Sequence, residues 1–392
     1  MVSGRQPGGD AQETGAGGRV RIGVDCTYAA RTVTGMERYA ASLCAALRRA
    51  DTHHRFIDLH PRLPEQLEKG LGSQVKRFLI EQCTLPAAAA KAHPDLMFYP
   101  AFPPGPFAAR PFAMIVYDAV PWLYRDTMGL LGRCYAAPLA RRAARRTAAI
   151  LTISKAVTNE LGALLGGNRA EIACVGGGVD AAPAPCGPRE REATLARLGL
   201  RSPFLLAVGS LEPRKNYPAL FRAMRLVGAG SEVQLAVAGR WAWASGELRR
   251  LEEEAGGRIK ILGYVSDADL AVLYDAAECC LQASLYEGLG LPVLEALAHG
   301  LPVIANDIAV FRELGAERVH LVDFEDAKQV AERILWLLGN PQERARRQAD
   351  AVTLTREFTW DAAAARALAV FDRLESSARA GAKIQYERQP AA

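Results

Sequence analysis

The sequence predicts an α/β protein with two domains, each built on a mostly parallel sheet, that face each other across a cleft. Short apolar runs alternate with helical segments along most of the chain, a pattern typical of parallel sheets covered by helices. The alternation stops at residues 181–188, AAPAPCGP, which indicate a linker, and starts again at Phe204. Each half should therefore bind ligands at the carboxyl ends of its strands.

The strands are predicted from apolar runs and the helices between them from apolar residues at helical spacing. The helix after the first strand is expected at residues 36–48. The strands of the first half are expected at 20–25, 56–60, 96–99, 113–117, 150–153 and 172–175. Those of the second half are expected at 204–208, 233–238, 259–262, 279–283, 303–305 and 320–322.

Length and charge limit the classes of protein that this chain can belong to. It has 392 residues, of which 50% are hydrophobic, and this suits two or three domains with sizeable cores. The formal net charge of +5 is mild for this length and argues against a dedicated nucleic-acid binder. The same charge permits an anionic ligand or a membrane surface.

Cysteine and histidine patterns indicate free thiols and no metal site. The 8 cysteines include no C-x-x-C pair, so we expect reduced thiols and a cytoplasmic protein. No H-E-x-x-H motif is present, and His53 and His54 come just before a predicted strand. Residues 1–18 are Gly-rich and polar, so we expect a disordered tail rather than a signal peptide or an anchor. No apolar run is long enough for a transmembrane helix.

The strongest candidate site lies in residues 284–304, SLYEGLGLPVLEALAHGLPVI. The Gly-rich turn 288–291 follows Glu287 and opens into an apolar helix, whose free N–H groups and dipole favour an anion. Glu295, one turn into the helix, would meet a group attached to a bound phosphate. We interpret the stretch as a site for a nucleotide diphosphate that carries a hydroxylated group. An ordinary loop before a helix is the alternative.

A second candidate lies in the loop 209–216, GSLEPRKN, after the first strand of the second half. Arg214 and Lys215 would lie at the same sheet edge as the Gly-rich turn. Two fixed cations opposite a helix N-terminus would hold a diphosphate and stabilise the charge that it develops on leaving. A solvated Arg–Lys pair is the alternative, and the shared edge disfavours it.

Two weaker candidates lie in the first half. Gly35 would start a helix at the carboxyl end of the first strand, where open α/β sheets bind ligands, but a plain turn explains it equally well. Asp118 would face the cleft at the end of a strand, and capping of a turn before Pro121 is the equal alternative. The fingerprint G-x-G-x-x-G is absent here, which argues against a dehydrogenase.

A basic cluster lies within residues 139–149, which we expect to be helical. Its four arginines would line one helix face, because they follow the spacing i, i+1, i+4 and i+5. We favour a solvated face, and the alternative is a contact with anionic lipid at the inner membrane surface or with a phosphorylated acceptor. The arginines are Arg141, Arg142, Arg145 and Arg146.

An acidic motif, Asp267-Ala268-Asp269, matches the D-x-D pattern of metal-dependent sugar transfer. Ser266 precedes it and an apolar helical run follows it. Capping of a helix start and complementation of the helix dipole therefore explain both acids without a metal.

Together these motifs resemble family 4 retaining glycosyltransferases of the GT-B fold. The similarity runs from about residue 20 to 378, and the E-x7-E stretch with the RKN loop is its most specific part. The matching segments are EGLGLPVLE (287–295) continued by ALAHGLPVIA, VGSLEPRKN (208–216), GYVSDADLAVLY (263–274), TG-x-x-RY (34–39), EQ-x-x-LP (81–86), YD-x-x-P (117–121) and FTW (358–360).

The resemblance implies a role for each candidate and no need for a metal or cofactor. Arg214 and Lys215 would bind the donor diphosphate, Glu287 would contact the transferred sugar, and Glu295 would contact the ribose. Tyr264 and Val265 would flank the base, and Gly35 would approach the phosphate from the other domain. The implied catalytic residues are Arg214, Lys215, Glu287 and Asp118, and the implied donor-binding residues are Gly35, Ser210, Tyr264, Val265, Gly288, Leu289, Gly290, Leu291 and Glu295.

The same resemblance implies the domain boundaries. Residues 19–182 would form a Rossmann-like acceptor domain, which a final helix at 361–380 would rejoin. Residues 188–360 would form a Rossmann-like donor domain, and 381–392 a flexible tail.

Two departures from the family pattern concern the donor site. Many members have Arg at the position of Ser210, whereas this chain has an Arg at 214. Many also have His-Asp where this chain has Tyr117-Asp118, and that His normally reaches the donor sugar. The RKN and YD-x-x-P variants resemble mannosyltransferases of surface-polysaccharide assembly, which favours GDP-mannose over a UDP-hexose.

The predicted reaction is transfer of a hexose from a nucleotide diphosphate sugar to an acceptor hydroxyl, with retention of configuration. The acceptor would be a glycan, a lipid-linked sugar or a small molecule. A sugar phosphorylase or a nucleotide-sugar epimerase on a similar fold is one alternative. The other is a non-catalytic nucleotide-sugar-binding subunit, which the missing His at Tyr117 supports.

Overall fold

The computed structural model describes residues 20–30, 35–50, 52–63, 73–128, 132–167, 170–180, 182–184, 186–228, 232–241, 246–315 and 317–379. The tails predicted at 1–18 and 381–392 lie outside these residues, and so do Thr34 and Ala181. No helix among the described residues is both long and apolar enough to cross a membrane.

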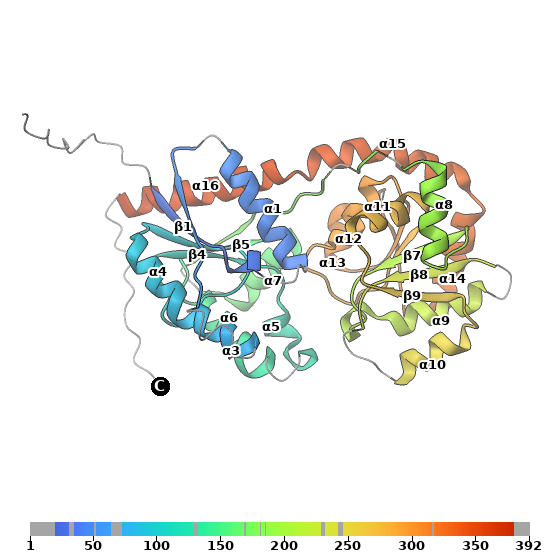
Figure 1. Ribbon diagram of the computed structural model, residues 1–392, viewed down its shortest axis with the longest axis horizontal. Coiled ribbons are helices and arrows are strands. Elements are labelled where there is room, and N and C mark those ends of the chain that lie inside the picture. The colour runs from blue at the N-terminus through green and yellow to red at the C-terminus, as the bar shows by residue number, and fades with distance from the viewer. Residues whose placement is uncertain are drawn as a thin grey trace, which may run out of the picture.

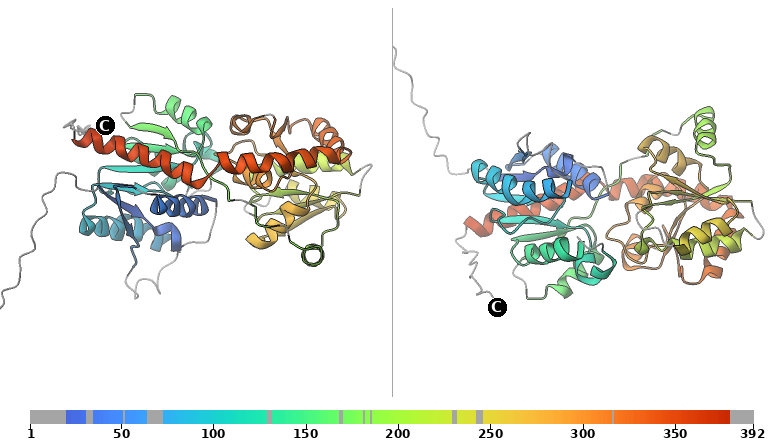
Figure 2. Two further views of the ribbon diagram at one scale, coloured as in Figure 1. Left: turned by 90° about the horizontal axis from the view of Figure 1, so that it is seen from above. Right: turned by 60° about the horizontal axis from the view of Figure 1, so that its bottom comes forward.

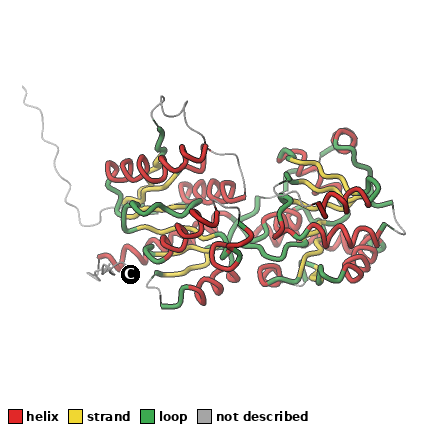
Figure 3. The backbone as a smooth tube through the Cα atoms, turned by 90° about the horizontal axis from the view of Figure 1, so that it is seen from below, coloured by secondary structure: helices red, strands yellow, loops and turns green. Residues whose placement is uncertain are grey.

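The first domain is built on a 6-stranded parallel sheet in the order β2-β1-β3-β4-β5-β6. Its central strands are buried on both faces, because helices cover the sheet from either side, and Figure 3 shows this layering. The strands are β1 (Arg21–Asp25), β2 (Arg55–Leu59), β3 (Leu96–Tyr99), β4 (Phe112–Val116), β5 (Ala149–Thr152) and β6 (Glu171–Cys174).

The second domain repeats this plan with a 6-stranded parallel sheet in the order β12-β11-β10-β7-β8-β9. Every strand predicted from the sequence is present in the two sheets, with bounds shifted by at most one residue. The strands are β7 (Phe204–Val208), β8 (Gln234–Ala238), β9 (Ile259–Gly263), β10 (Cys280–Gln282), β11 (Val303–Asn306) and β12 (His320–Val322).

Helices alternate with the strands along the chain. They form in the segments where apolar residues recur at helical spacing among polar ones. Those of the first domain are α1 (Gly35–Arg49), α3 (Ser73–Leu79), α4 (Leu85–Ala92), α5 (Val120–Leu123), α6 (Ala137–Ala144) and α7 (Lys155–Leu164). Those of the second are α8 (Pro188–Arg197), α9 (Tyr217–Val227), α10 (Gly246–Glu254), α11 (Asp267–Ala276), α12 (Leu291–Ala298), α13 (Ala309–Leu314), α14 (Ala327–Leu338) and α15 (Pro341–Glu357). The last helix is α16 (Trp360–Arg379).

Two lobes lie side by side, and the chain crosses between them twice (Figure 1). Residues 175–187 lead from the first sheet to α8 of the second lobe, and α16 returns along the first lobe after α15 (Figure 2). Arg366 of α16 donates to the carbonyl of Val175, and Arg373 pairs with Glu171 at 2.5 Å. The fold is therefore GT-B: two Rossmann-like domains facing across a cleft, with the carboxyl ends of both sheets near it.

Candidate active site

The Gly-rich turn forms the contact between the two domains at the start of α12. Gly290 precedes the helix with a φ of 78°, in the left-handed region that favours glycine. A Cβ at Gly288 would lie 2.0 Å from the carbonyl oxygen of Tyr117, at the end of β4. Glycine at both positions thus lets the turn lie against the first domain at the start of α12.

Glu287 gathers the cations of the RKN loop around one buried carboxylate. Its Oε1 accepts hydrogen bonds from Nζ of Lys215 at 2.5 Å, Oγ of Ser284 at 2.8 Å and Nε2 of Gln282 at 2.9 Å. Its Oε2 accepts one from Nη1 of Arg214 at 3.2 Å. The strand β10 and its extension place the acid, and the short helical turn Pro213–Lys215 places both cations.

The electrostatics of this group keep Glu287 ionised. Burial by itself raises the pKa of the Glu287 carboxyl, which is 8% exposed, but the charges of Lys215 and Arg214 outweigh burial and hold that pKa at about 2. Arg214 also pairs with Glu212 at 2.7 Å and donates to the carbonyl of Tyr286. The guanidinium of Arg214 and the ammonium of Lys215 are therefore each held in a fixed orientation.

Asp118 lies in the first domain and faces the same charges. Its Oδ1 accepts from the N–H of Val120 at 3.0 Å, so it caps the turn before α5 as one sequence interpretation expected. Burial raises the pKa of the Asp118 carboxyl, the charge of Arg214 lowers it, and the charge of Glu287 raises it further. Because these charges act on it, Asp118 belongs to the site as well as to the turn.

Glu295 has different partners, and one of them comes from the opposite domain. Its Oε1 accepts from Nη2 of Arg38 at 2.9 Å, and its Oε2 accepts from the hydroxyl of Tyr274 at 2.9 Å. Arg38 lies on α1, so this ion pair crosses the cleft. Burial raises the pKa of the Glu295 carboxyl, although Arg38 and Tyr274 act against this increase.

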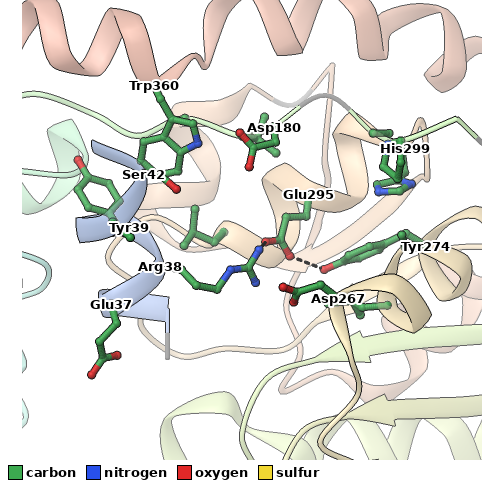
Figure 4. A pocket seen from close by; sticks show the side chains of 18 of the residues that line it. Glu37, Arg38, Tyr39, Ser42, Asp180, Asp267, Tyr274, Glu295, His299 and Trp360 are labelled. Atoms are coloured by element: carbon green, nitrogen blue, oxygen red, sulfur yellow. Dashed lines mark hydrogen bonds and ion pairs between the residues drawn. The ribbon is translucent and has the colours of Figure 1, made fainter. Parts of the chain in front are cut away.

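A cavity of about 570 Å³ lies between the domains beside Glu295, with Arg38 and Tyr274 at its wall (Figure 4). This volume is within the roughly 300–1,000 Å³ range of small-ligand pockets. The wall comes from α1, α11, α12, the start of α16 and the connecting residues 178–180 and 182–183. Leu291 and Glu295 line the cavity, whereas the group around Glu287 does not.

Leu289 of the Gly-rich turn is buried between the two domains. Its side chain is 5% exposed and belongs to the hydrophobic core that both domains share. A Cβ at Gly177 would lie 2.5 Å from Cδ2 of Leu289. Leu289 thus anchors the Gly-rich turn on the first crossing of the chain, while Leu291 of the same turn lines the cavity.

The remaining predicted donor-binding residues do not line this cavity. Gly35 starts α1 and is exposed, with open space around it. Ser210 and Val265 are half-buried, at the ends of loops that follow β7 and β9. Tyr264 is 68% exposed, and the guanidinium of Arg240 stacks over its ring at 4.8 Å. Tyr264 thus offers a free aromatic face at the sheet edge.

Tyr117 turns away from the cleft. Its hydroxyl donates to the carbonyl of Pro100 at 2.6 Å and lies 3.2 Å from the carbonyl of Met36. Its ring packs edge-on against Tyr39 at 5.3 Å between centroids. Tyr117 therefore supports the start of α1 through Met36 and Tyr39.

The prediction of four arginines along one helix face is wrong. The helix α6 ends at Ala144, so Arg145 and Arg146 follow it. Arg141 donates to the carbonyls of Pro121 and Trp122, and Arg146 donates to that of Pro106. Satisfying these loop carbonyls holds two of the four side chains against the protein, and Arg142 and Arg145 remain exposed.

The capping explanation of the D-x-D match is confirmed. Ser266 is the N-cap of α11, and its hydroxyl accepts from the N–H of Asp269 at 3.2 Å. Asp269 pairs with Arg197 of α8 at 2.5 Å. Asp267 lines the cavity beside Glu295.

Sequence reasoning missed several polar residues that the structure brings to the site. Gln282 and Ser284 are 3% and 0% exposed, and a buried polar pair just before Glu287 was a usable signal. Tyr286 accepts from the N–H of Ala119 and donates to Glu160, both at 2.7 Å, so it joins the domains. No local pattern points to the Tyr286 contact, because it depends on how the domains meet, whereas Arg38 lies within the TG-x-x-RY segment, for which no role of Arg38 was predicted.

The fold and this cluster agree with comparisons to known proteins. Residues 190–352 match the family described as glycosyl transferases group 1. The matched residues all lie in the second domain. The match spans α8 to α15 and so includes the RKN loop, the Gly-rich turn and both glutamates of the E-x7-E stretch.

Curated proteins similar to this chain include two mannosyltransferases. O-antigen chain mannosyltransferase B of Escherichia coli is 31% identical over 195 residues, or 49% of this chain and 50% of the relative. Phosphatidyl-myo-inositol mannosyltransferase of Mycobacterium leprae is 32% identical over 181 residues, or 44% and 46%. The chain thus spans about half the length of the curated relatives it matches.

A solved structure supports the fold over almost the whole chain. Sucrose-phosphate synthase from Thermosynechococcus elongatus superposes with a TM-score of 0.67 at 20% identity, covering 92% of this chain and 100% of the other. The similarity therefore extends the GT-B architecture to the first domain, beyond the residues matched by the family.

Proposed function

We propose that this protein is a retaining hexosyltransferase that moves a sugar from a nucleotide diphosphate donor to an acceptor hydroxyl. The observation that carries the proposal is the cluster in which ionised Glu287 holds Lys215 and Arg214 beside the N-terminus of α12. Two cations beside a Gly-rich turn at a helix N-terminus would suit a diphosphate. The proposed setting is the synthesis of a glycan, a glycolipid or a glycosylated metabolite.

The mechanism uses this cluster to stabilise the leaving group. As the glycosidic bond breaks, negative charge grows on the diphosphate, and Lys215, Arg214 and the amides of the turn are already oriented toward it. Because these groups supply the positive charge, we propose that transfer needs no metal ion. The acceptor would attack on the face that the diphosphate leaves, and the leaving phosphate oxygen would take the acceptor's proton.

The sugar would lie between the two walls of the cleft. Oε2 of Glu287 has Arg214 as its partner and retains a lone pair for a hydroxyl of the sugar. Asp118 lies opposite, in reach of the same charges, where it would contact the sugar from the first domain. Glu295 and Tyr264 would receive the ribose and the base.

We propose mannose as the transferred sugar and GDP-mannose as the donor, with a UDP-hexose as the second candidate. The names of the two curated relatives support mannose. The acceptor would enter over the first domain. Contact with a membrane surface would use Arg142 and Arg145, which are exposed.

Incubation with GDP-mannose, UDP-glucose and a panel of acceptor sugars tests the proposal. We expect release of one nucleoside diphosphate and a glycoside of unchanged anomeric configuration by NMR, with the same rate in EDTA. Phosphate-dependent release of sugar 1-phosphate would indicate a phosphorylase, and an altered donor without release would indicate an epimerase. Tight nucleotide-sugar binding with no turnover would indicate a non-catalytic subunit.

A further inference from the structure

A cluster of two histidines and two acids lies on the first domain, away from the cleft residues described above. His53 and His54 directly precede β2, and Asp372 and Glu375 lie on α16. Each residue offers one ligand atom, and these four atoms lie within 4.8 Å of one another. Nε2 of His54 lies 2.8 Å from Oδ1 of Asp372, and Nε2 of His53 lies 2.9 Å from Oε2 of Glu375.

Packing around the cluster fixes the positions of both segments. Phe371 of α16 is 1% exposed, and its ring meets those of His54 and Phe98 edge-on, at 6.3 Å and 5.3 Å between centroids. The side chain of His54 is itself 0% exposed, and its ring lies 4.2 Å from that of His53. Asp372 and Glu375 share a helix face because they are three residues apart. The four ligand atoms therefore converge because of apolar contacts.

We propose that these four side chains bind a divalent transition-metal ion such as Zn²⁺. Imidazole nitrogens and carboxylate oxygens are zinc ligands, and a tetrahedral site with bonds near 2.0–2.1 Å places its ligand atoms about 3.3 Å apart. The distances of 2.8, 2.9 and 3.6 Å between nitrogens and oxygens of the cluster bracket that value. Two imidazoles also favour such an ion over Mg²⁺ or Ca²⁺, which take oxygen ligands.

A second group of potential metal ligands lies on the same domain, and its surroundings argue against a metal there. Cys26, Asp58 and His60 also lie within 4.8 Å of one another. The guanidinium of Arg48 already occupies that group, 2.5 Å from Oδ1 of Asp58 and 3.7 Å from Sγ of Cys26. In the histidine cluster, the neighbouring cation Arg373 bonds Glu171 instead. Arg48 thus neutralises the Cys26 group, whereas the guanidinium of Arg373, next to the histidine cluster, is hydrogen-bonded to Glu171 and acts on Asp372 only through its charge.

A metal at this position would fasten α16 to the first domain. Other polar ties of the helix are the hydrogen bond from Arg366 to the carbonyl of Val175 and surface ion pairs, such as Arg49 with Asp361, whose side chains are 61% and 76% exposed. Exposed pairs of this kind contribute little stability. Coordination by groups from residues 53–54 and 372–375 would join parts of the chain that are more than 300 residues apart, as the separation of 318 for His54 and Asp372 shows. The ion would be structural and would take no part in sugar transfer.

The test uses the full chain, stripped of metal with EDTA and dialysed. We expect one equivalent of ZnCl₂ to bind by calorimetry and to raise Tm, and MgCl₂ at the same concentration to leave Tm unchanged. Co²⁺ should give the visible absorption of a tetrahedral site with nitrogen and oxygen ligands. Absence of stoichiometric Zn²⁺ binding would overturn the proposal.

Variants locate the ion. His53→Gln and Asp372→Asn change side chains that are 57% and 50% exposed, so both variants should fold. Each should weaken Zn²⁺ affinity by at least the roughly 10–100-fold that loss of an outer-shell partner costs. His60→Gln is the matched control, because it removes an exposed histidine from the arginine-filled group. Zinc binding that persists in His53→Gln, or that His60→Gln abolishes, would place the ion elsewhere.

Discussion

Glu287 and Glu295 lie on one short stretch of chain, yet their surroundings act on them in opposite ways. Four side chains bond Glu287, and all of them come from the second domain, so its pKa is held at about 2. Glu295 bonds Arg38 of the first domain and Tyr274, and burial raises its pKa. The cluster at Glu287 is complete within one domain, whereas the pair at Glu295 exists only when the two domains meet.

This difference indicates which functional role suits each of the two glutamates. A group held by four partners in one domain keeps its geometry whether the cleft is open or closed, as stabilisation of a leaving group requires. An ion pair that bridges the cleft, with Arg38 44% exposed, can exchange its partner for a ligand at small cost. We therefore propose that the Glu287 cluster takes part in the chemistry and that Glu295 couples ligand binding to closure of the cleft.

The largest expected effect is on turnover when the cation cluster is broken. Lys215→Ala should lower kcat/KM by about 100-fold or more, because loss of one electrostatic contact to developing charge costs about 3 kcal/mol. Lys328→Ala is the control, since that side chain on α14 is 82% exposed. Steady-state rates with the preferred donor give the comparison, and wild-type turnover in Lys215→Ala would remove this residue from the mechanism.

The next effect is on stability and its pH dependence. The Glu287 pKa is lowered from 4.5 to about 2, so its ionisation favours the folded state by about 3 kcal/mol at neutral pH. This contribution is present above the unfolded-state pKa and is lost as the pH falls through 4.5 toward 2. Urea unfolding should show Glu287→Gln less stable by about this amount at pH 7, with the difference shrinking in acid.

A matched variant controls for loss of a glutamate charge in general. Glu332→Gln, on α14 with a side chain 67% exposed, should leave the free energy of unfolding almost unchanged at both pH values. Equal pH dependence of Glu287→Gln and the wild type would contradict the ionised, cation-paired state of Glu287.

Glu295→Gln should have the opposite consequence for stability and a separate one for binding. Because burial raises the Glu295 pKa, ionisation at pH 7 disfavours the folded state, and the neutral amide should melt no lower than the wild type. A nucleotide at a hundred times its Kd stabilises by about 2.7 kcal/mol, and this gain should shrink in the variant if Glu295 receives the ribose. A full nucleotide-induced rise in Tm would refute that role.

The smallest effect on stability is expected from substitution of Arg38, which pairs with Glu295 across the cleft. Arg38→Ala removes a half-exposed ion pair, so the free energy of unfolding should fall by less than about 1 kcal/mol. Freed from Arg38, Glu295 should bind the nucleotide a few-fold more tightly in a calorimetric titration. Arg49→Ala, on the same helix and paired with exposed Asp361, should leave the nucleotide Kd unchanged. Weaker binding in Arg38→Ala alone would mean that Arg38 contacts the ligand itself.

Much of the fold was predictable because its signals are local. Apolar runs and helical periodicity are properties of short windows, and each strand predicted from them is present. The error at Arg141–Arg146 has a tertiary cause, since carbonyls of loops 20 and 40 residues away bind Arg141 and Arg146. The charges of the site were likewise visible, because Arg214, Lys215 and Glu287 all follow strands of the same sheet.

Partners from distant parts of the chain were not predictable in this way. Arg38 and Glu295 are 257 residues apart, and Tyr286 and Glu160 are 126 apart. His54 and Asp372 meet only because α16 returns to the first domain. The spacing of residues along the chain determined the two sheets, the anion-binding turn and the cations beside it. The packing of the two domains against each other decided which charges are paired across the cleft, and the packing of α16 on the first domain brought His54 to Asp372. These contacts depend on surfaces that no short window of sequence encodes.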